Sequence, residues 1–241
     1  NWKMVNDDPN INFRPFYYSD VRVDPKRPNI LFSISGRLSR SKDSGVTWER
    51  IAKTVHGDHQ SLWIDPENPD YILNAFKKIS DEILESYYGC GIIIPDCLEG
   101  ANIIDLGCGT GRDVYLLSQF VGENGQVVGV DMTDEQIEKA ESFKDYHREK
   151  FNYSHSNVIF KKGYIEFLND LGLQNNTYDI VVSNCVVNLS PDKEAVFKQV
   201  YNILKEGGEF YFSDVYSSKR IPEHLREDSV LWGECLSGAL Y

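Results

Sequence analysis

The sequence predicts an α/β protein in which a doubly wound, mostly parallel sheet follows a small antiparallel β segment. From residue 101 onward, short apolar runs alternate with stretches of helical spacing, a pattern typical of repeated βαβ units. A glycine-rich turn, Gly107 to Gly111, joins the first such strand to the first helix. Before residue 76, short apolar strands are separated by Asp-Pro and Asn-Pro turns, which favour antiparallel pairs.

Composition divides the chain into two domains, residues 1–75 and 76–241. The first carries 10 basic and 10 acidic side chains, and the second 15 and 27, giving a net charge of −12. An acidic chain is a poor nucleic-acid binder. No apolar run approaches membrane-spanning length, so we expect neither a nucleic-acid nor a membrane partner.

The cysteines are five in number and all lie in the second domain: Cys90, Cys97, Cys108, Cys185 and Cys235. An odd, scattered set is a poor disulfide framework. It predicts free thiols in a reducing compartment, the cytoplasm.

The first domain contains a repeat, because the Asp-Pro turn at Asp24 recurs 41 residues later at Asp65, a period typical of propeller blades. Between the two lies Ser41-Lys-Asp-Ser-Gly-Val-Thr-Trp48. This string resembles the Asp-box hairpin of sialidase-like and sortilin-like β-propellers, where the Asp and Gly close a turn and the Trp packs into the blade. One blade period cannot build a propeller pocket, so we expect no catalytic function here. We interpret the His56-Gly-Asp-His59 string as polar turn residues, with a metal or acid–base pair as the alternative.

In the second domain the pattern predicts five strands, at 101–106, 126–131, 157–161, 178–183 and 208–213. Helices are predicted at 76–88, 112–120, 133–150, 164–170, 191–204 and 222–231. Thr133 and Gln136 form an expected capping box, and Pro191 is the expected first residue of its helix.

The glycine turn is preceded by Asp105 and contains Gly107, Gly109 and Gly111. A second acid, Asp131, ends the next strand 20 residues after Gly111, where a carboxylate can accept hydrogen bonds from ribose hydroxyls. The spacing differs from the dinucleotide fingerprint and resembles motif I of the class I methyltransferases. That resemblance implies a Rossmann-like sheet and S-adenosyl-L-methionine as cofactor.

Further strings narrow the family: Tyr87-Tyr-Gly-Cys-Gly, Val182-Ser-Asn-Cys-Val-Val-Asn-Leu, and Leu231-Trp-Gly-Glu-Cys-Leu-Ser-Gly-Ala-Leu-Tyr241. From about residue 76 to its end, the chain resembles the arsenite methyltransferases. The resemblance implies that Cys90, Cys185 and Cys235 bind arsenic, which arrives as arsenite or its thiol conjugates. It also implies small thiols or a thioredoxin-like protein as reductant.

The chemistry suits cysteine, because trivalent arsenic is a soft centre and thiolates suit soft centres. Three thiolates, or two and a small thiol, leave the arsenic lone pair available for the sulfonium methyl group. Catalysis then rests largely on positioning. The alternative is three buried cysteines that only pack in the core. Cys97 and Cys108 lie outside the arsenic-binding strings and are interpreted as structural.

The cofactor residues that the resemblance implies are Tyr88, Asp105, Gly107, Gly109, Gly111, Asp131, Met132, Ile165, Glu166 and Asn184. Met132 is expected against the adenine face, with core packing as the alternative.

Two departures from the family stand out. The segment before Tyr87 lacks a cysteine, and the last two strands of the usual seven-stranded sheet are absent, so we expect a C-terminally truncated domain with impaired activity. Three rival interpretations stay open: a methyltransferase acting on carbon or oxygen of a small metabolite, a non-enzymatic propeller-type binding protein, and an artificial join of two unrelated genes.

Overall fold

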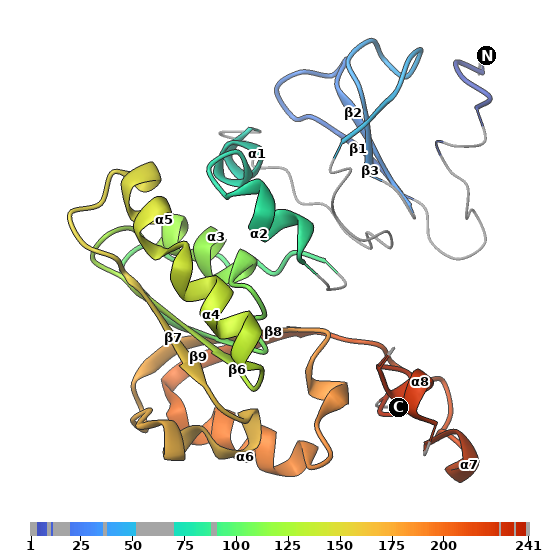
Figure 1. Ribbon diagram of the computed structural model, residues 1–241. Helices are drawn as coiled ribbons and strands as arrows, with labels where there is room; N and C mark the ends of the chain where they lie inside the picture. Colours follow the sequence, from blue (N-terminus) through green and yellow to red (C-terminus); the bar gives the residue numbers. More distant parts are fainter. Residues whose placement is uncertain are drawn as a thin grey trace. The chain divides into compact units, whose positions relative to one another are not determined.

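The computed structural model describes residues 4–8, 11, 20–35, 38–51, 70–87, 91–226, 228–233 and 235–239. The chain divides into two compact units, Asn1–Lys77 and Lys78–Tyr241, each drawn in Figure 1. Among the described residues, no helix has the length and apolar character needed to cross a bilayer.

The first unit contains the predicted antiparallel sheet. Its strands pair in sequence order and are β1 (Asp20–Val23), β2 (Leu31–Ile34), β3 (Leu38–Ser41) and β4 (Glu49–Arg50). Phe32, Ile34 and Leu38 are buried, so the sheet has an apolar face despite its short strands.

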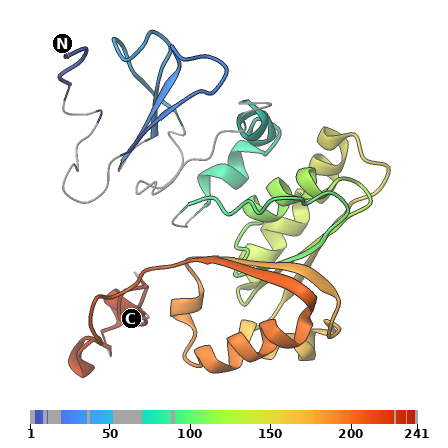
Figure 2. The ribbon, with the colours of Figure 1, turned by 180° about the vertical axis from the view of Figure 1, so that it is seen from behind.

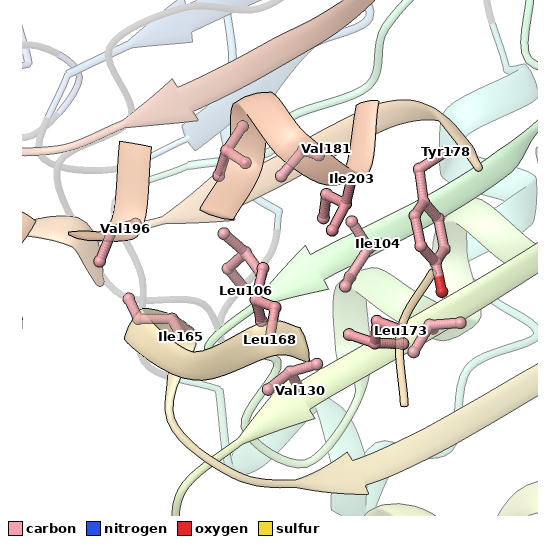
Figure 3. Packing of buried hydrophobic residues seen from close by; sticks show 12 residues of the cluster. Ile104, Leu106, Val130, Ile165, Leu168, Leu173, Tyr178, Val181, Val196 and Ile203 are labelled. Atoms are coloured by element: carbon pink, nitrogen blue, oxygen red, sulfur yellow. The ribbon is translucent and has the colours of Figure 1, made fainter. Parts of the chain in front are cut away.

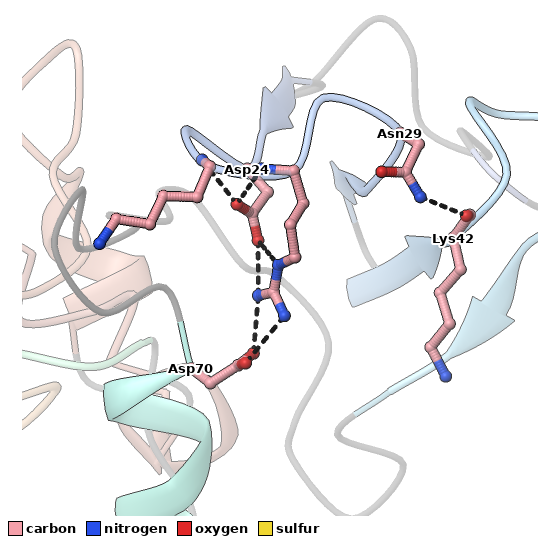
Figure 4. A network of polar contacts seen from close by, with 6 residues as sticks. Asp24, Asn29, Lys42 and Asp70 are labelled. Atoms are coloured by element: carbon pink, nitrogen blue, oxygen red, sulfur yellow. Dashed lines mark hydrogen bonds and ion pairs between the residues drawn. The ribbon is translucent and has the colours of Figure 1, made fainter.

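The Asp-Pro turn after β1 is held by charge (Figure 4). The buried Asp24 carboxylate accepts hydrogen bonds from the backbone N–H groups of Lys26 and Arg27. The Arg27 guanidinium contacts both Asp24, at 2.7 Å, and Asp70, at 2.9 Å, just before α1 (Tyr71–Phe76). Although burial opposes it, the Arg27 contact keeps the pKa of Asp24 below its usual value. The second copy of the repeat, around Asp65, lies outside the described residues, as do His56, Asp58 and His59.

The hairpin between β3 and β4 is closed by side chains. Ser41 Oγ accepts from Gly45 N at 2.8 Å, and Asp43 Oδ1 accepts from Thr47 N at 2.8 Å. The Trp48 indole donates to Gly45 O at 2.9 Å. Gly45 has a φ of +89°, which a glycine adopts without strain.

The second unit is built on a five-stranded parallel sheet of order β7-β6-β5-β8-β9, which confirms the predicted Rossmann-like fold. The strands are β5 (Asn102–Leu106), β6 (Gln126–Asp131), β7 (Val158–Lys162), β8 (Tyr178–Asn184) and β9 (Leu204–Ser213).

Helices cover both faces of this sheet (Figures 1 and 2). On one face lie α3 (Arg112–Val121), α4 (Asp134–Ser142) and α5 (Lys144–Phe151), and on the other η1 (Ile165–Leu171) and α6 (Lys193–Ile203). Figure 3 shows the core beneath α6, where Ile104 and Leu106 of β5 pack with Leu168 and Ile203. Burial on both faces explains the nearly continuous apolar runs of the strands.

Several predicted boundaries were wrong. The helix expected over 133–150 is interrupted at Phe143. Thr133 makes no side-chain cap hydrogen bond, and its N–H donates to Asp131 Oδ1 in place of the expected Gln136. α6 begins at Lys193 and not at Pro191, and the Asp192 side chain caps it by accepting from Ala195 N.

The segments before and after the sheet are also more broken than predicted. In place of single helices over 76–88 and 222–231, the chain forms short ones: α1, α2 (Asp81–Glu85), α7 (Glu223–Arg226) and α8 (Ser229–Gly233). A further turn, η2 (Val187–Leu189), follows β8.

Candidate functional site

The glycine turn lies at the carboxyl end of β5 and leads into α3. Gly107 N and Cys108 N both donate to Val130 O of β6, at 2.8 and 3.0 Å. A Cβ on Gly107 would lie 2.3 Å from the Val186 side chain, and one on Gly111 2.8 Å from Phe160. Both glycines also have positive φ, so the turn requires them. At Gly109, by contrast, a Cβ would meet only the Gln136 amide, at 3.9 Å.

Asp131 ends β6 and its carboxylate is tied to this turn. Its Oδ2 accepts from Gly109 N and its Oδ1 from Thr133 N, both at 2.9 Å. A carboxylate has about four acceptor sites. Two remain for ligand hydroxyl groups, while the carboxylate itself is already oriented by the backbone.

Asp105 is buried at the end of β5. Burial, followed by the negative charge of nearby Asp113, raises its pKa well above the usual value, and Asp131 adds to the effect. Clustered acids at one edge of the sheet are a suitable environment for a cation, because a positive ligand would relieve their repulsion.

A network that the sequence reasoning missed ties the segment before β5 to this edge. Asn184 Nδ2 donates to the Tyr87 hydroxyl at 2.6 Å, to Gly91 O at 2.9 Å and to Asp113 Oδ2 at 3.3 Å. The buried Arg112 guanidinium stacks on the Tyr87 ring and pairs with Asp113 at 2.6 Å. The available signal was the Arg112-Asp113 pair, two charges at the start of an otherwise apolar helix.

The remaining predicted cofactor residues differ in how far they are buried. Met132 is largely exposed in the turn after β6, whereas Ile165 packs in the core. The Glu166 carboxylate is buried and accepts a hydrogen bond from Ser190 Oγ. Tyr88 lies outside the described residues, and its role in cofactor binding stays a prediction.

Two of the three predicted arsenic-binding cysteines converge. Cys185 directly follows β8, and the Cys235 thiol donates to the Cys185 carbonyl oxygen at 3.3 Å. Both residues are buried and have a left-handed backbone, with φ of 56° and 60°. Such backbone is uncommon outside glycine and often marks functional sites. Cys90 lies outside the described residues.

Cys185 is disulfide-bonded, so the prediction of five free thiols was wrong for this residue. The other described cysteines, Cys97, Cys108 and Cys235, are free thiols.

Cys97 and Cys108 differ in their surroundings. Cys97 is exposed, so it fills no core position. Cys108 packs beneath the glycine turn, where a Cβ on Gly129 would lie 2.8 Å from its sulfur. Burial raises the pKa of the Cys108 thiol, and the charges of Asp105 and Asp131 raise it further. That thiol therefore stays protonated and suits a packing role.

The chain is similar in sequence to known arsenite methyltransferases. Human arsenite methyltransferase is 55% identical over 173 residues, covering 72% of this chain and 46% of that protein. The rat arsenite methyltransferase is 51% identical over 202 residues, covering 83% and 55%. The chain thus spans about half the length of the curated relatives it matches.

Among solved structures, an arsenic(III) S-adenosylmethionine methyltransferase from Chlamydomonas reinhardtii superposes with a TM-score of 0.68 at 47% identity, covering 70% of this chain and 57% of that one. These comparisons do not support the resemblance of residues 1–75 to an Asp-box propeller. Residues 98–240 match the family described as "Methyltransferase domain". The chain belongs to this methyltransferase family.

Proposed function

We propose that the second unit transfers a methyl group from S-adenosyl-L-methionine to trivalent arsenic held by cysteine thiolates. The observation that carries the proposal is the meeting of Cys235 with Cys185 at the carboxyl end of β8, one strand away from the glycine turn. The similarity to arsenite methyltransferases supports the same substrate.

The residues at the turn suit this cofactor. Its sulfonium and amino groups are cationic, and Asp105, Asp113 and Asp131 are acids that interact with one another there. At Gly109 a Cβ would contact only the Gln136 amide, at 3.9 Å, and Asp131 has acceptor sites left for ribose hydroxyls. When bound, the cofactor supplies an electrophilic methyl group. Of the other implied residues, Asn184 donates to the Tyr87 hydroxyl and to Gly91 O, and the exposed Met132 is available to an adenine ring.

Arsenic is bound, in this proposal, by Cys90, Cys185 and Cys235. Thiolates are soft ligands suited to a soft centre. The arsenic lone pair would form the new bond to the methyl carbon without a general base, while the methyl–sulfur bond breaks and S-adenosyl-L-homocysteine leaves with that electron pair. The protein contributes by orienting the arsenic towards the methyl group. The left-handed backbone at Cys185 and Cys235 constrains the directions of their two side chains.

The disulfide at Cys185 must be opened before arsenic binds there. Opening it takes two electrons and two protons, which a pair of thiols or a dithiol protein supplies while forming a disulfide of its own. A small thiol or a thioredoxin-like reductant therefore belongs to the reaction.

For the first unit we propose a structural role and no catalytic one, with residues 1–75 forming a separate domain. The Ser41–Trp48 hydrogen bonds close the hairpin from within, which is the behaviour of a structural turn.

Calorimetric titration of the reduced full chain, first with S-adenosyl-L-methionine and then with arsenite, tests the function. Both are expected to bind, and the arsenite signal should disappear in Cys185→Ser but persist in Cys97→Ser, which alters an exposed cysteine ahead of β5. Cofactor binding without arsenite binding would instead favour a methyltransferase acting on carbon or oxygen.

A further inference from the structure

Asn188 lies three residues past Cys185 and is completely buried. Its side-chain Nδ2 donates to Val215 O at 2.6 Å and to Cys235 O at 3.4 Å. Its backbone N–H donates to Asp214 Oδ2 at 2.9 Å. One residue of the loop after β8 is thus bonded both to the segment that follows β9 and to the segment that carries Cys235.

The chain on the far side of Cys235 also packs on Asn188. A Cβ added to Gly238 would lie only 1.9 Å from Asn188 O, so the backbones approach as closely as glycine permits. Contacts at Cys235 and three residues beyond it therefore converge on Asn188, and the Cys235 thiol reaches the Cys185 carbonyl oxygen.

The other half of the Asn188 amide is unsatisfied. Within the described part of the chain, no donor contacts Oδ1, although the atom is buried. Burying an unpaired acceptor costs free energy, which an apolar side chain of similar size would avoid. The amide is therefore better explained by what its Nδ2 holds in place than by fold stability.

We propose that Asn188 is a positioning residue for the arsenic-binding thiol of Cys235. By holding the Cys235 and Val215 carbonyl groups, it keeps the thiol against Cys185, ready for a ligand shared by both sulfur atoms. The catalytic meaning of this contact depends on the proposed arsenic chemistry, whereas the positioning of the thiol can be measured without arsenic.

Asn157 provides a matched control. It is also a buried asparagine of the second unit, and its Nδ2 donates to two backbone carbonyl oxygens, Ser118 O at 3.2 Å and Gly122 O at 2.9 Å. These carbonyls lie at the end of α3 away from the glycine turn. Asn157→Leu therefore removes two such bonds, together with the one that Asn157 Oδ1 accepts from Ser118 Oγ at 2.6 Å, without touching Cys235.

The first measurement is the rate at which iodoacetamide alkylates Cys235 in the full chain, followed by peptide mass spectrometry without reductant, with Cys108 as internal reference. Asn188→Leu is expected to accelerate Cys235 alkylation about tenfold or more relative to Cys108, because the segment opens locally. Asn157→Leu should leave the ratio unchanged. Equal ratios in Asn188→Leu and the wild type, or equal acceleration by both variants, would overturn the proposal. If Asn188→Leu does not fold, Asn188→Ser carries the same expectation.

The second measurement separates positioning from general destabilisation in the reduced protein. Asn188→Leu should weaken arsenite binding about tenfold or more and leave S-adenosyl-L-methionine binding within about twofold, while Asn157→Leu changes neither. Equal losses for the two ligands would contradict a positioning role. If the wild type binds no arsenite, the proposed function fails, and the alkylation ratio alone decides whether Asn188 positions the thiol.

Discussion

The Cys235 thiol donates a hydrogen bond to the backbone carbonyl of Cys185 at 3.3 Å, although 50 residues separate them in the sequence. Both residues are buried, and the cysteine that follows β8 is fixed by its Cys185 N to Ser213 O bond, at 2.7 Å, to the end of β9. Cys185 is therefore held at the end of a strand, whereas Cys235 reaches it from the C-terminal segment.

Replacing Cys235 with serine is expected to weaken arsenite binding by about 100-fold or more, because a hard hydroxyl replaces a soft thiolate. Cofactor binding should stay within about twofold. Isothermal titration of the reduced protein measures both, with Cys97→Ser as control. An unchanged arsenite affinity would remove Cys235 from the site.

Sequence reasoning located the sheet well, because strands buried on both faces leave long apolar runs that end at glycine or acid residues. The turn around Gly107 was also predictable, because the spacing of its three glycines is a local sequence pattern. The wrong boundaries are those decided by tertiary contacts. Thr133 has a good cap sequence, but its N–H is taken by Asp131.

The parts of the site that depend on distant segments were beyond sequence reasoning. Nothing in the string around Asn188 indicates that its amide reaches Val215 and Cys235. The contacts of Asn184 with Tyr87 and Asp113 likewise join segments about 70 to 100 residues apart. Such contacts are fixed only when the sheet and its connecting segments pack together.

Asp131→Ala should weaken S-adenosyl-L-methionine binding by about 1.5–3 kcal/mol for each ribose bond lost, since hydrogen bonds to a charged group are worth that much. The loss of its bond to Gly109 N also loosens the turn. Asp134→Ala removes a neighbouring exposed carboxylate paired with Lys162 and should leave affinity unchanged. Equal affinity of Asp131→Ala and wild type in calorimetry would show that Asp131 does not bind the ribose.

Asp105 should make cofactor affinity depend on pH. Its pKa is raised above the unfolded-state value of 3.8, so the folded protein retains a proton there that a cationic ligand displaces. Affinity should therefore rise with pH above about 4 and level off once Asp105 is ionised in the unliganded protein. Titrations across pH 5–8 test this, and Asp105→Asn should bind more weakly with little pH dependence. A pH-dependent affinity that survives in Asp105→Asn would point to another group.

The same variant should be more stable than the wild type without cofactor. Ionising a buried carboxyl disfavours the folded state, and this penalty is fully present above the raised pKa. Asp105→Asn removes it, so we expect a higher free energy of unfolding at pH 8 and a gain that shrinks as the pH falls towards 3.8. Urea unfolding at several pH values measures it, and a loss of stability at pH 8 would contradict the interpretation.

Gly238→Ala should separate the C-terminal segment from Asn188. The new Cβ would meet Asn188 O at 1.9 Å, a clash that the backbone can relieve only by moving away. We expect a loss of about 1–3 kcal/mol in unfolding free energy and weaker arsenite binding. Gly233→Ala is the control, because a Cβ there meets no atom within 4 Å. If both substitutions have equal effects, the close approach at Gly238 is unimportant.

His147 should make the second unit sensitive to acid. The ring is buried, stacks on Tyr115 at 3.7 Å between centroids, and its Nε2 accepts from Ser80 N at 3.3 Å. Burial lowers the pKa of His147 from 6.5 to about 4. Between these two pH values, His147 is protonated in the unfolded chain and neutral in the folded one. The contribution of neutral His147 to the free energy of unfolding should therefore be complete above pH 6.5. It should decline by roughly 3 kcal/mol in total as the pH falls from 6.5 to about 4.

Urea unfolding at pH 7.0 and pH 5.0 tests this expectation, with His147→Gln as the comparison because glutamine does not titrate. The wild type should lose more stability between the two pH values than the variant does. His155, which is exposed and contacts Glu123 at 3.6 Å, supplies the control: His155→Gln should retain the wild-type pH dependence. If His147→Gln declines as steeply as the wild type, the acid sensitivity belongs to other groups and the neutral His147 ring does not stabilise the fold.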